Sequence, residues 1–223
     1  MDRYDFIIFD FDDTLWARDE KDIRCSEYNI KFINKYLYNK SIIISGNSFE
    51  SIQTKLNLIQ TTLPFVCAEA NSCIFKEGEF ISYFPTCEII HVDEIIHFVE
   101  ELEVNYQVLK RDNKVFNIKI KPVYSDKDRI EIVDTLNHKF RQNSLDCVAR
   151  KLGNTTVDIL SKNNSKVEAF KALNLYKYKT LYIGDEIYEG NDKDIANLCT
   201  RKIAVSNVYE TKALLDCFGR RDI

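Results

Sequence analysis

The sequence predicts an α/β fold, in which a Rossmann-like, doubly wound parallel sheet forms a core and an α+β domain is inserted into it. Two observations lead to this fold class. Short, nearly continuous apolar runs alternate with helical patterns up to residue 69 and again after residue 161, as in parallel sheets covered on both faces. Between these two regions, paired strand patterns joined by turns predominate. We therefore expect a core made of residues 1–69 and 161–223, with the insertion at residues 70–160.

Composition and charge narrow the class of protein. The 223 residues are 45% hydrophobic and 30% charged, which is typical of a folded globular chain. A net charge of −4 disfavours nucleic acid as the main partner, because nucleic-acid binders present clustered basic residues. The apolar runs are too short to cross a bilayer and the first residues do not resemble a signal peptide, so we expect no membrane association and a cytoplasmic location. The seven scattered cysteines include no Cys-x-x-Cys pair and are expected to be reduced thiols.

The first part of the core is expected to alternate strand and helix. Ser26 is the expected cap of a first helix, whose apolar side chains recur at helical spacing up to residue 37. Asn47 or Ser48 is expected to cap a second helix that extends to residue 59. The apolar runs that predict buried strands are residues 4–9, 42–46 and 65–68.

The insertion has a different order of predicted elements. Two hairpins are expected, with Gly78 turning the first at residues 73–83 and Gly153 turning the second at residues 146–160. The other predicted elements are helices at 93–103 and 126–142 and strands at 106–110 and 114–121. Hairpins with helices on one side indicate an α+β layer.

The α/β alternation returns after the insertion. Ser165 is expected to begin a helix that ends at Leu173. The elements predicted beyond it are strands at 180–184 and 202–205 and helices at 192–198 and 208–218.

The sequence Phe9-Asp10-Phe11-Asp12-Asp13-Thr14 directly follows the first strand. Alternation places Asp10 and Asp12 on the same side at the strand end, where α/β folds bind ligands. Two carboxylates brought together are unfavourable unless a cation, a lysine or a shared proton offsets their charge. The alternative interpretation is an acidic turn, since Asp and Thr both favour turns.

Two further features lie at a strand end and at a helix start. Ser45-Gly46 follows the second strand and offers a hydroxyl and free backbone N–H groups to a phosphate oxygen, although this pair is also an ordinary strand-to-helix connection. Lys166 begins the helix after the insertion, where its charge opposes the helix dipole, which suggests a use elsewhere; an exposed lysine is the alternative.

The segment from Gly184-Asp185 to Asn191-Asp192 follows another buried strand. Carboxylate and amide oxygens at a strand end suit Mg²⁺, which prefers hard oxygen ligands. A calcium-like loop or a plain acidic turn has the same composition.

Taken together, these motifs resemble those of the haloacid dehalogenase superfamily of phosphoryl-transfer enzymes. Its Asp-x-Asp-x-Thr motif matches Asp10, Asp12 and Thr14, and its Ser or Thr at a strand end matches Ser45. The family lysine matches Lys166, and its Gly-Asp and Asn-Asp motif matches Asp185 and the pair Asn191-Asp192. An α/β insertion between the second and third motifs resembles subfamily IIB, the branch of sugar phosphatases and phosphomannomutases, in which this insertion is a cap that determines specificity.

The resemblance implies a Mg²⁺-dependent phosphatase that acts on a small phosphorylated metabolite, most simply a sugar phosphate. Asp10 would be the nucleophile that forms an aspartyl-phosphate, and Asp12 would be the general acid and base. Mg²⁺ would be held by the Asp10 carboxylate, the Asp12 backbone carbonyl and Asp185. Asn191 and Asp192 would tune the waters of the metal or orient Lys166. Ser45, Gly46 and Lys166 would hold the phosphoryl oxygens, and Thr14 would support the loop.

Substrate choice would then come from the cap. Alternation along residues 116–121 places Asn117, Lys119 and Lys121 on one face of a strand, where they could bind sugar hydroxyls or a second phosphate. A solvated lysine face is the alternative.

Two alternative functions remain at the level of the sequence. Six positions separate Asp185 from Asn191, which resembles the longer loop of the phosphomannomutases, so a phosphohexomutase is one alternative. A catalytically silent binding module is the other.

Overall fold

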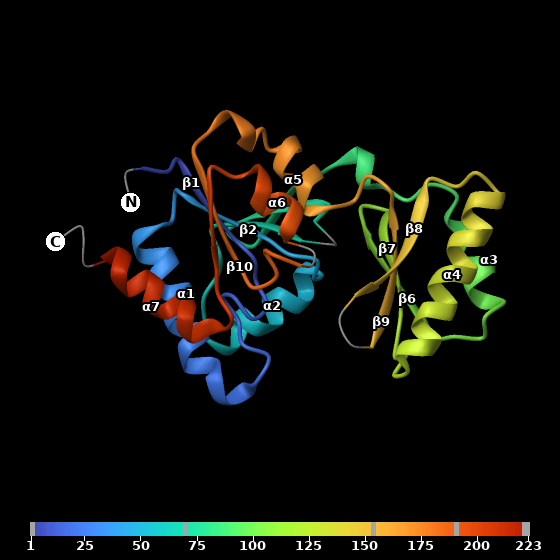
Figure 1. Cartoon of the computed structure of the whole chain (residues 1–223), viewed down its shortest axis with the longest axis horizontal. Helices are drawn as coiled ribbons and strands as arrows, with labels where there is room; N and C mark the ends of the chain where they lie inside the picture. The colour runs from blue at the N-terminus through green and yellow to red at the C-terminus, as the bar shows by residue number, and fades with distance from the viewer. Residues whose placement is uncertain (1–2, 69–70, 153–154, 190–191, 220–223) are drawn as a thin grey trace. The chain divides into compact units, whose positions relative to one another are not determined.

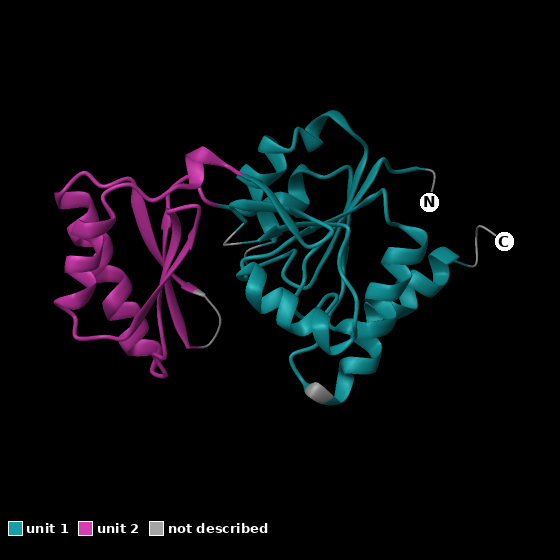
Figure 2. Cartoon of the chain, turned by 180° about the vertical axis from the view of Figure 1, so that it is seen from behind, with its two compact units in different colours: residues 1–82, 165–223 teal, residues 83–164 magenta. Residues whose placement is uncertain are grey.

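The computed structural model describes residues 3–68, 71–152, 155–189 and 192–219 (Figure 1). The chain divides into two compact units (Figure 2): unit 1 comprises residues 1–82 and 165–223, and unit 2 comprises residues 83–164. Among the described residues, no helix is both long enough and apolar enough to cross a membrane. The predicted fold class, an α/β core with a second α+β layer, is confirmed.

Unit 1 is built on a seven-stranded sheet with the order β11-β10-β1-β2-β3-β4-β5. The five strands from β11 to β3 are parallel, and β4 is antiparallel to β3. The strands are β1 (Phe6–Phe9), β2 (Ser41–Ile44), β3 (Phe65–Ala68), β4 (Cys73–Lys76), β5 (Glu79–Tyr83), β10 (Thr180–Gly184) and β11 (Arg201–Ala204). The central strand β1 has neighbours on both sides, with Phe9 in register with Ile183 of β10 and Ile43 of β2.

Helices cover both faces of this sheet. Figure 1 shows α5 and α6 on one side and α1, α2 and α7 on the other. The helices are α1 (Ile23–Tyr36), α2 (Phe49–Leu58), α5 (Lys166–Ala172), α6 (Lys193–Leu198) and α7 (Val208–Gly219), with short 3₁₀ turns at Glu20–Asp22 and Leu175–Lys177. Burial on both faces explains the continuous apolar runs, since Ile7, Ile8 and Phe9 are all at most 1% exposed.

The local signals at the helix starts are partly confirmed. Ser48 and Ser165 cap α2 and α5, each accepting a hydrogen bond from the backbone N–H three residues ahead. The expected cap at Ser26 is wrong, because α1 begins three residues earlier, at Ile23. Ser26 instead lies inside the helix, fully buried, where its hydroxyl accepts a hydrogen bond from the backbone N–H of Ala17 at 2.9 Å.

The first predicted hairpin does form, with Gly78 at φ 91°, but it belongs to unit 1 and not to the insertion. Strand β4 pairs with β3 from Ala68↔Cys73 to Phe65↔Lys76, so the hairpin extends the core sheet. The compact units therefore divide at residues 82/83 and 164/165, whereas the sequence placed the boundaries at 69/70 and 160/161. The local pattern of a hairpin does not reveal which sheet it will join.

Unit 2 is a four-stranded antiparallel sheet with the order β6-β7-β9-β8, packed against two helices. Its elements are β6 (Tyr106–Arg111), β7 (Lys114–Ile120), β8 (Cys147–Leu152), β9 (Thr156–Ser161), α3 (Val92–Glu100), α4 (Asp126–Gln142) and a 3₁₀ turn at Pro85–Cys87. Ile118 and Ile159 of the sheet form one core with Val99 of α3 and Leu136 of α4. Gly153, the predicted turn between β8 and β9, lies outside the described residues.

Candidate active site

A buried ion-pair network lies at the carboxyl ends of the central strands of unit 1. Lys166, the first residue of α5, directs its Nζ to Asp10 Oδ1 at 2.5 Å, and the same ammonium pairs with Asp192 Oδ1. Asp10 directly follows β1, and Asp192 lies at the start of α6 without capping it. The side chains of Lys166 and Asp192 are 4% and 0% exposed. Lys166 is therefore not a solvated surface lysine, and the alternative considered from the sequence is excluded.

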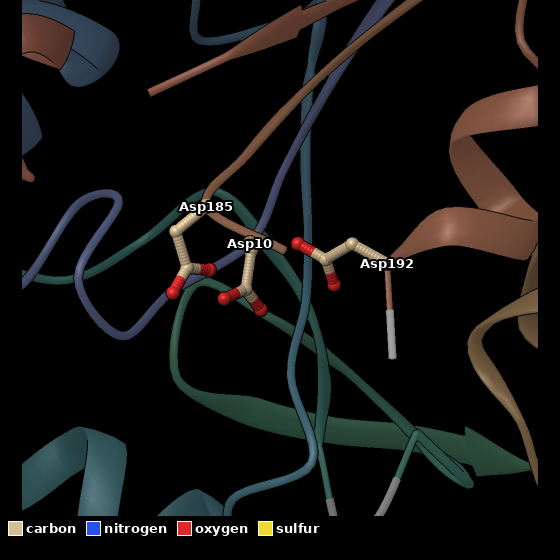
Figure 3. A group of neighbouring side chains, drawn as sticks. All are labelled: Asp10, Asp185 and Asp192. Atoms are coloured by element: carbon tan, nitrogen blue, oxygen red, sulfur yellow. The ribbon is translucent and has the colours of Figure 1, made fainter. Parts of the chain in front are cut away.

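Asp185 completes an acidic cluster with Asp10 and Asp192. One carboxylate oxygen from each residue lies within 4.8 Å of the others, and Figure 3 shows Asp10 between Asp185 and Asp192. Gly184, the last residue of β10, makes this packing possible, because a Cβ there would lie 2.2 Å from Asp192 Oδ2. The cluster joins residues far apart in the sequence because the parallel strands β1 and β10 are neighbours and end at the same edge.

Burial and charge perturb these groups in a consistent pattern. Burial raises the pKa of Asp10 to about 7, although the charge of Lys166 opposes the shift. Burial also raises the pKa of Asp185, and the negative charge of Asp192 raises it further. Burial lowers the pKa of Lys166, but the two carboxylates outweigh burial and hold the pKa well above its ordinary value. One ammonium thus pairs with two carboxylates, and a third, that of Asp185, lies beside them.

Tyr182, on β10, extends the network and was not among the residues predicted from the sequence. Its hydroxyl lies 3.4 Å from Lys166 Nζ, and its side chain is fully buried. Burial raises its pKa well above the ordinary value, as do the charges of Asp192 and Asp10. The tyrosine therefore remains neutral. Sequence periodicity marks position 182 only as a buried strand residue, which a tyrosine can also fill through packing alone.

The loop after β1 is fixed by its own backbone. The N–H groups of Leu15 and Trp16 both donate to the carbonyl of Phe11 at 2.8 Å, and the N–H of Asp13 donates to the carbonyl of Trp16 at 2.8 Å. Asp13 has a φ of 53°, in the left-handed region that aspartate tolerates better than most residues. Thr14 belongs to this loop and is fully buried, which is compatible with the supporting role expected for it.

Asp12 does not join Asp10, although alternation had suggested that the two carboxylates converge. Its Oδ1 accepts from Lys55 Nζ at 2.7 Å and its Oδ2 accepts from Asn47 Nδ2 at 2.7 Å. Only one residue separates the two aspartates in the sequence, but they occupy different environments. Asp10 contacts Lys166 in the interior, and Asp12 contacts Lys55 of α2 and Asn47 before it. The strand has already ended at Phe9, so strict alternation no longer applies.

Ser45 lies one strand away from Asp10, at the end of β2. It is 2% exposed, and its Oγ accepts from the backbone N–H of Asn47 at 3.2 Å. Gly46 has no atom within 4 Å of the position that a Cβ would occupy, so its backbone is sterically open on that side. Asn191 lies outside the described residues.

The predicted polar face of unit 2 gathers around Asp158 of β9. Asn117 Nδ2 donates to Asp158 Oδ2 at 2.7 Å, and Lys119 Nζ lies 3.7 Å from the same oxygen. Burial raises the pKa of Asp158, and the nearby charges of Lys119 and Lys121 oppose that shift. Asn117 and Asp158 are nearly inaccessible, whereas Lys121 is exposed just beyond the end of β7. The alternative interpretation, a solvated polar face, therefore holds for Lys121 but not for the buried Asn117.

The acidic cluster fits a divalent cation. Its donor set consists of carboxylate oxygens, the ligands that Mg²⁺ prefers, and their spacing would allow one ion to contact more than one of them. A cation would also offset the charge that Lys166 leaves unbalanced. Lys166 pairs with one oxygen of Asp10 and one of Asp192, whereas no ion pair with Lys166 is seen for Asp185 among the described residues.

Comparison with known protein families gives one match over most of the chain. The model of the haloacid dehalogenase-like hydrolases matches residues 7–147, which include the loop after β1, the end of β2 and most of unit 2. No curated protein sequence matches significantly.

Solved structures share the fold at low sequence identity. IMP-nucleotidase from Plasmodium falciparum has a TM-score of 0.64 and 18% identity, over 96% of this chain and 61% of that chain. A haloacid dehalogenase-like hydrolase from B. subtilis has a TM-score of 0.64 and 13% identity, over 94% and 92% of the two chains. Sucrose-phosphatase from Synechocystis has a TM-score of 0.61 and 14% identity, over 96% and 88%. The present chain thus spans less than two thirds of that nucleotidase but most of the other two.

Proposed function

Because the chain belongs to the haloacid dehalogenase-like hydrolase family, we propose that it is a phosphatase that hydrolyses a small phosphomonoester through an aspartyl-phosphate on Asp10. The observation that carries this proposal is the buried contact between Lys166 and Asp10 beside Asp185 and Asp192. A nucleophilic carboxylate needs a nearby cation to approach a phosphate dianion, and Lys166 lies in the position to supply that charge.

The reaction divides into two displacements. In the first, an oxygen of Asp10 forms a bond to phosphorus while the bond from phosphorus to the ester oxygen breaks, and Asp12 gives its proton to the leaving oxygen. In the second, a water oxygen forms a bond to phosphorus, its proton passes to Asp12, and the bond to Asp10 breaks. Inorganic phosphate and the alcohol are the products, and both aspartates return to their initial states.

The other residues of the core hold the phosphoryl group. The Lys166 ammonium, the Ser45 hydroxyl and the Gly46 backbone N–H donate hydrogen bonds to the oxygens of the transferring group. Thr14 supports the loop that carries both aspartates. Asp10 and Asp185, with the backbone carbonyl of Asp12, are the proposed ligands of Mg²⁺. When bound, Mg²⁺ supplies charge that reduces the repulsion between the carboxylate and the phosphate. Asp192 is proposed to orient Lys166, with which it pairs, and Asn191, which lies outside the described residues, to help hold the metal.

Substrate choice is proposed to come from unit 2, with Lys119 and Lys121 contacting the part of the substrate beyond the reacting phosphate. Asn117 is buried against Asp158, so its predicted contact with substrate is replaced by a supporting role within the sheet. The two ammonium groups suit hydroxyls or a second anionic group, so a sugar phosphate is the preferred substrate class. The names of two structural neighbours, a sucrose-phosphatase and an IMP-nucleotidase, support a small phosphorylated metabolite of this kind. A cytoplasmic location, where such metabolites occur, is part of the proposal.

A phosphate-release assay with sugar phosphates and nucleoside monophosphates, with Mg²⁺ and with EDTA, tests the proposal. We expect Mg²⁺-dependent release by the wild-type protein and by Asp134→Asn, which changes an exposed aspartate of α4, and none by Asp10→Asn. Mass spectrometry should find a phosphoryl group on Asp10. Activity that survives in EDTA or in Asp10→Asn would refute the mechanism.

The spacing between Asp185 and Asn191 favours one second candidate, a phosphohexomutase. A mutase would return the phosphoryl group from Asp10 to a second hydroxyl of the sugar. A hexose 1-phosphate separates the two candidates, because a phosphatase releases inorganic phosphate and a mutase produces the isomeric ester.

A further inference from the structure

The carboxyl group of Asp12 is held at both oxygens by side chains that the mechanism above does not use. Lys55 Nζ lies 2.7 Å from Oδ1, and Asn47 Nδ2 lies 2.7 Å from Oδ2. Both contacts belong to unit 1, and both come from the segment that follows β2. Two donors on opposite oxygens fix the rotation of a carboxyl group about its last bond, which one contact would leave free.

Lys55 is itself held in place. It lies in the last turn of α2, where a positive charge is favoured by the helix dipole. Its ammonium also lies 5.2 Å from the centroid of the ring of Phe11, the residue between the two aspartates. The Phe11 side chain is fully buried. The side chain is only 27% exposed, so its long stem does not extend freely into solvent.

Asn47 links Asp12 to the proposed phosphate-binding residue. Its side-chain amide donates to Asp12, while its backbone N–H donates to Ser45 Oγ at 3.2 Å. Movement of Asn47 would therefore displace the proton-transfer group and the phosphate-binding hydroxyl together.

We propose that Lys55 and Asn47 are positioning residues that hold the Asp12 carboxyl group for proton transfer, an inference that rests on the proposed phosphatase function. Each carboxylate oxygen has two lone pairs, and each accepts one side-chain hydrogen bond from the described residues, so a lone pair on each remains for a proton. When water attacks the aspartyl-phosphate, its proton goes to such a lone pair while the bond between phosphorus and Asp10 breaks. Misplacing this acceptor slows that step and leaves the attack by Asp10 itself intact.

Pre-steady-state kinetics with p-nitrophenyl phosphate separates the two steps. Nitrophenolate is a good leaving group that needs no proton, so the first displacement does not depend on Asp12. We expect Lys55→Met to lower the steady-state kcat by about 10²-fold, the cost of a misplaced catalytic group. KM should fall together with kcat, so that kcat/KM, which reports the first displacement, stays unchanged, and a burst of one nitrophenolate per active site should remain. Asn47→Ala should act in the same direction.

Two controls distinguish positioning from general damage. Lys55→Arg keeps the charge and should recover most of the lost kcat. Lys31→Met removes an exposed lysine of α1 that pairs with Glu27, and should behave as the wild type does.

The outcomes separate this inference from the proposal beneath it. An unchanged kcat in Lys55→Met refutes the positioning role while the wild-type phosphatase stands. Loss of the burst together with kcat also refutes it, since the damage then reaches Asp10. A wild-type protein that releases no phosphate from any ester refutes both proposals.

Discussion

Replacing Gly184 by alanine tests the packing that brings the acidic cluster together. The added Cβ would lie 2.2 Å from Asp192 Oδ2 and 2.7 Å from Tyr182 Cε1, and both distances are shorter than real Cβ contacts. Neither neighbour can move easily, since Asp192 is paired with Lys166 and Tyr182 is fully buried within β10. Alanine therefore has to displace either the carboxylate or the ring.

The expected cost follows from these two contacts. Overpacking a filled interior costs about 1–3 kcal/mol. Turning Asp192 away from Lys166 would add part of the ~3–5 kcal/mol that breaking a buried ion pair costs, although Asp10 still pairs with the lysine. We expect a loss of about 2–4 kcal/mol in the free energy of unfolding. At roughly 2–4 °C per kcal/mol for a chain of this size, the Tm should fall by about 4–16 °C.

Gly46 provides the matched control. It too lies at the carboxyl end of a core strand of unit 1, but no atom lies within 4 Å of its Cβ position. Gly46→Ala should therefore be neutral or stabilise by about 0.4–1 kcal/mol, through the reduced entropy of the unfolded chain. Urea unfolding and calorimetry of both variants measure the difference. Equal Tm values for Gly184→Ala and Gly46→Ala would refute the proposed close packing of Asp192.

Two further predictions concern unit 2. Burial raises the pKa of Asp158 above its ordinary value of 3.8, so the folded state binds its proton more tightly than the unfolded state does. As pH rises from 3.8 through the raised pKa, the free energy of unfolding of the wild type should therefore fall relative to that of Asp158→Asn and then reach a plateau. A difference between the two variants that does not depend on pH in urea titrations would contradict this. The double variant Lys119→Ala, Lys121→Ala should lower kcat/KM for the best substrate by about 10-fold or more, which corresponds to the loss of a hydrogen bond to a charged group. Normal turnover by this variant would show that the two lysines do not bind substrate.

The core strands could be predicted because burial on both faces leaves a continuous apolar run in the sequence. Residues 180–184 were predicted to be a strand, and β10 has these bounds. The helix caps at Ser48 and Ser165 were predictable because each hydroxyl accepts from the backbone N–H three residues ahead, which is a local contact. Ser26 was wrongly assigned because Ala17, nine residues earlier, supplies a partner that a local pattern does not show. The prediction that the hairpin after β3 belongs to the insertion was wrong for the same reason. Which sheet a strand joins depends on long-range contacts, and a local pattern does not show them.

The site was predictable to the extent that the parallel sheet collects strand ends at one edge. Asp10 and Asp185 could be placed near one another on that ground, whereas the position of Lys166 beside them and its pairing with Asp192 were expected only from the resemblance to the family. Lys55 and Tyr182 carried no signal, because a lysine on a helix and a tyrosine in a strand are ordinary in those positions. Asp158 was not identified because one aspartate in an alternating strand resembles a surface residue until its burial is known.

The two aspartates of the first loop show how the fold gives similar residues different chemistry. Asp10 is largely buried beside Lys166, and burial raises its pKa to about 7, which disfavours the ionised form. A nucleophile must be ionised, and a divalent cation against the carboxylates of Asp10 and Asp185 would lower that pKa. Asp12 lies in a more exposed position and is held by Lys55 and Asn47 instead. The same cation that reduces repulsion toward phosphate would therefore also activate Asp10, while leaving Asp12 on its own pair of donors to move protons. Removing the cation should consequently impair the attack by Asp10 for two independent electrostatic reasons.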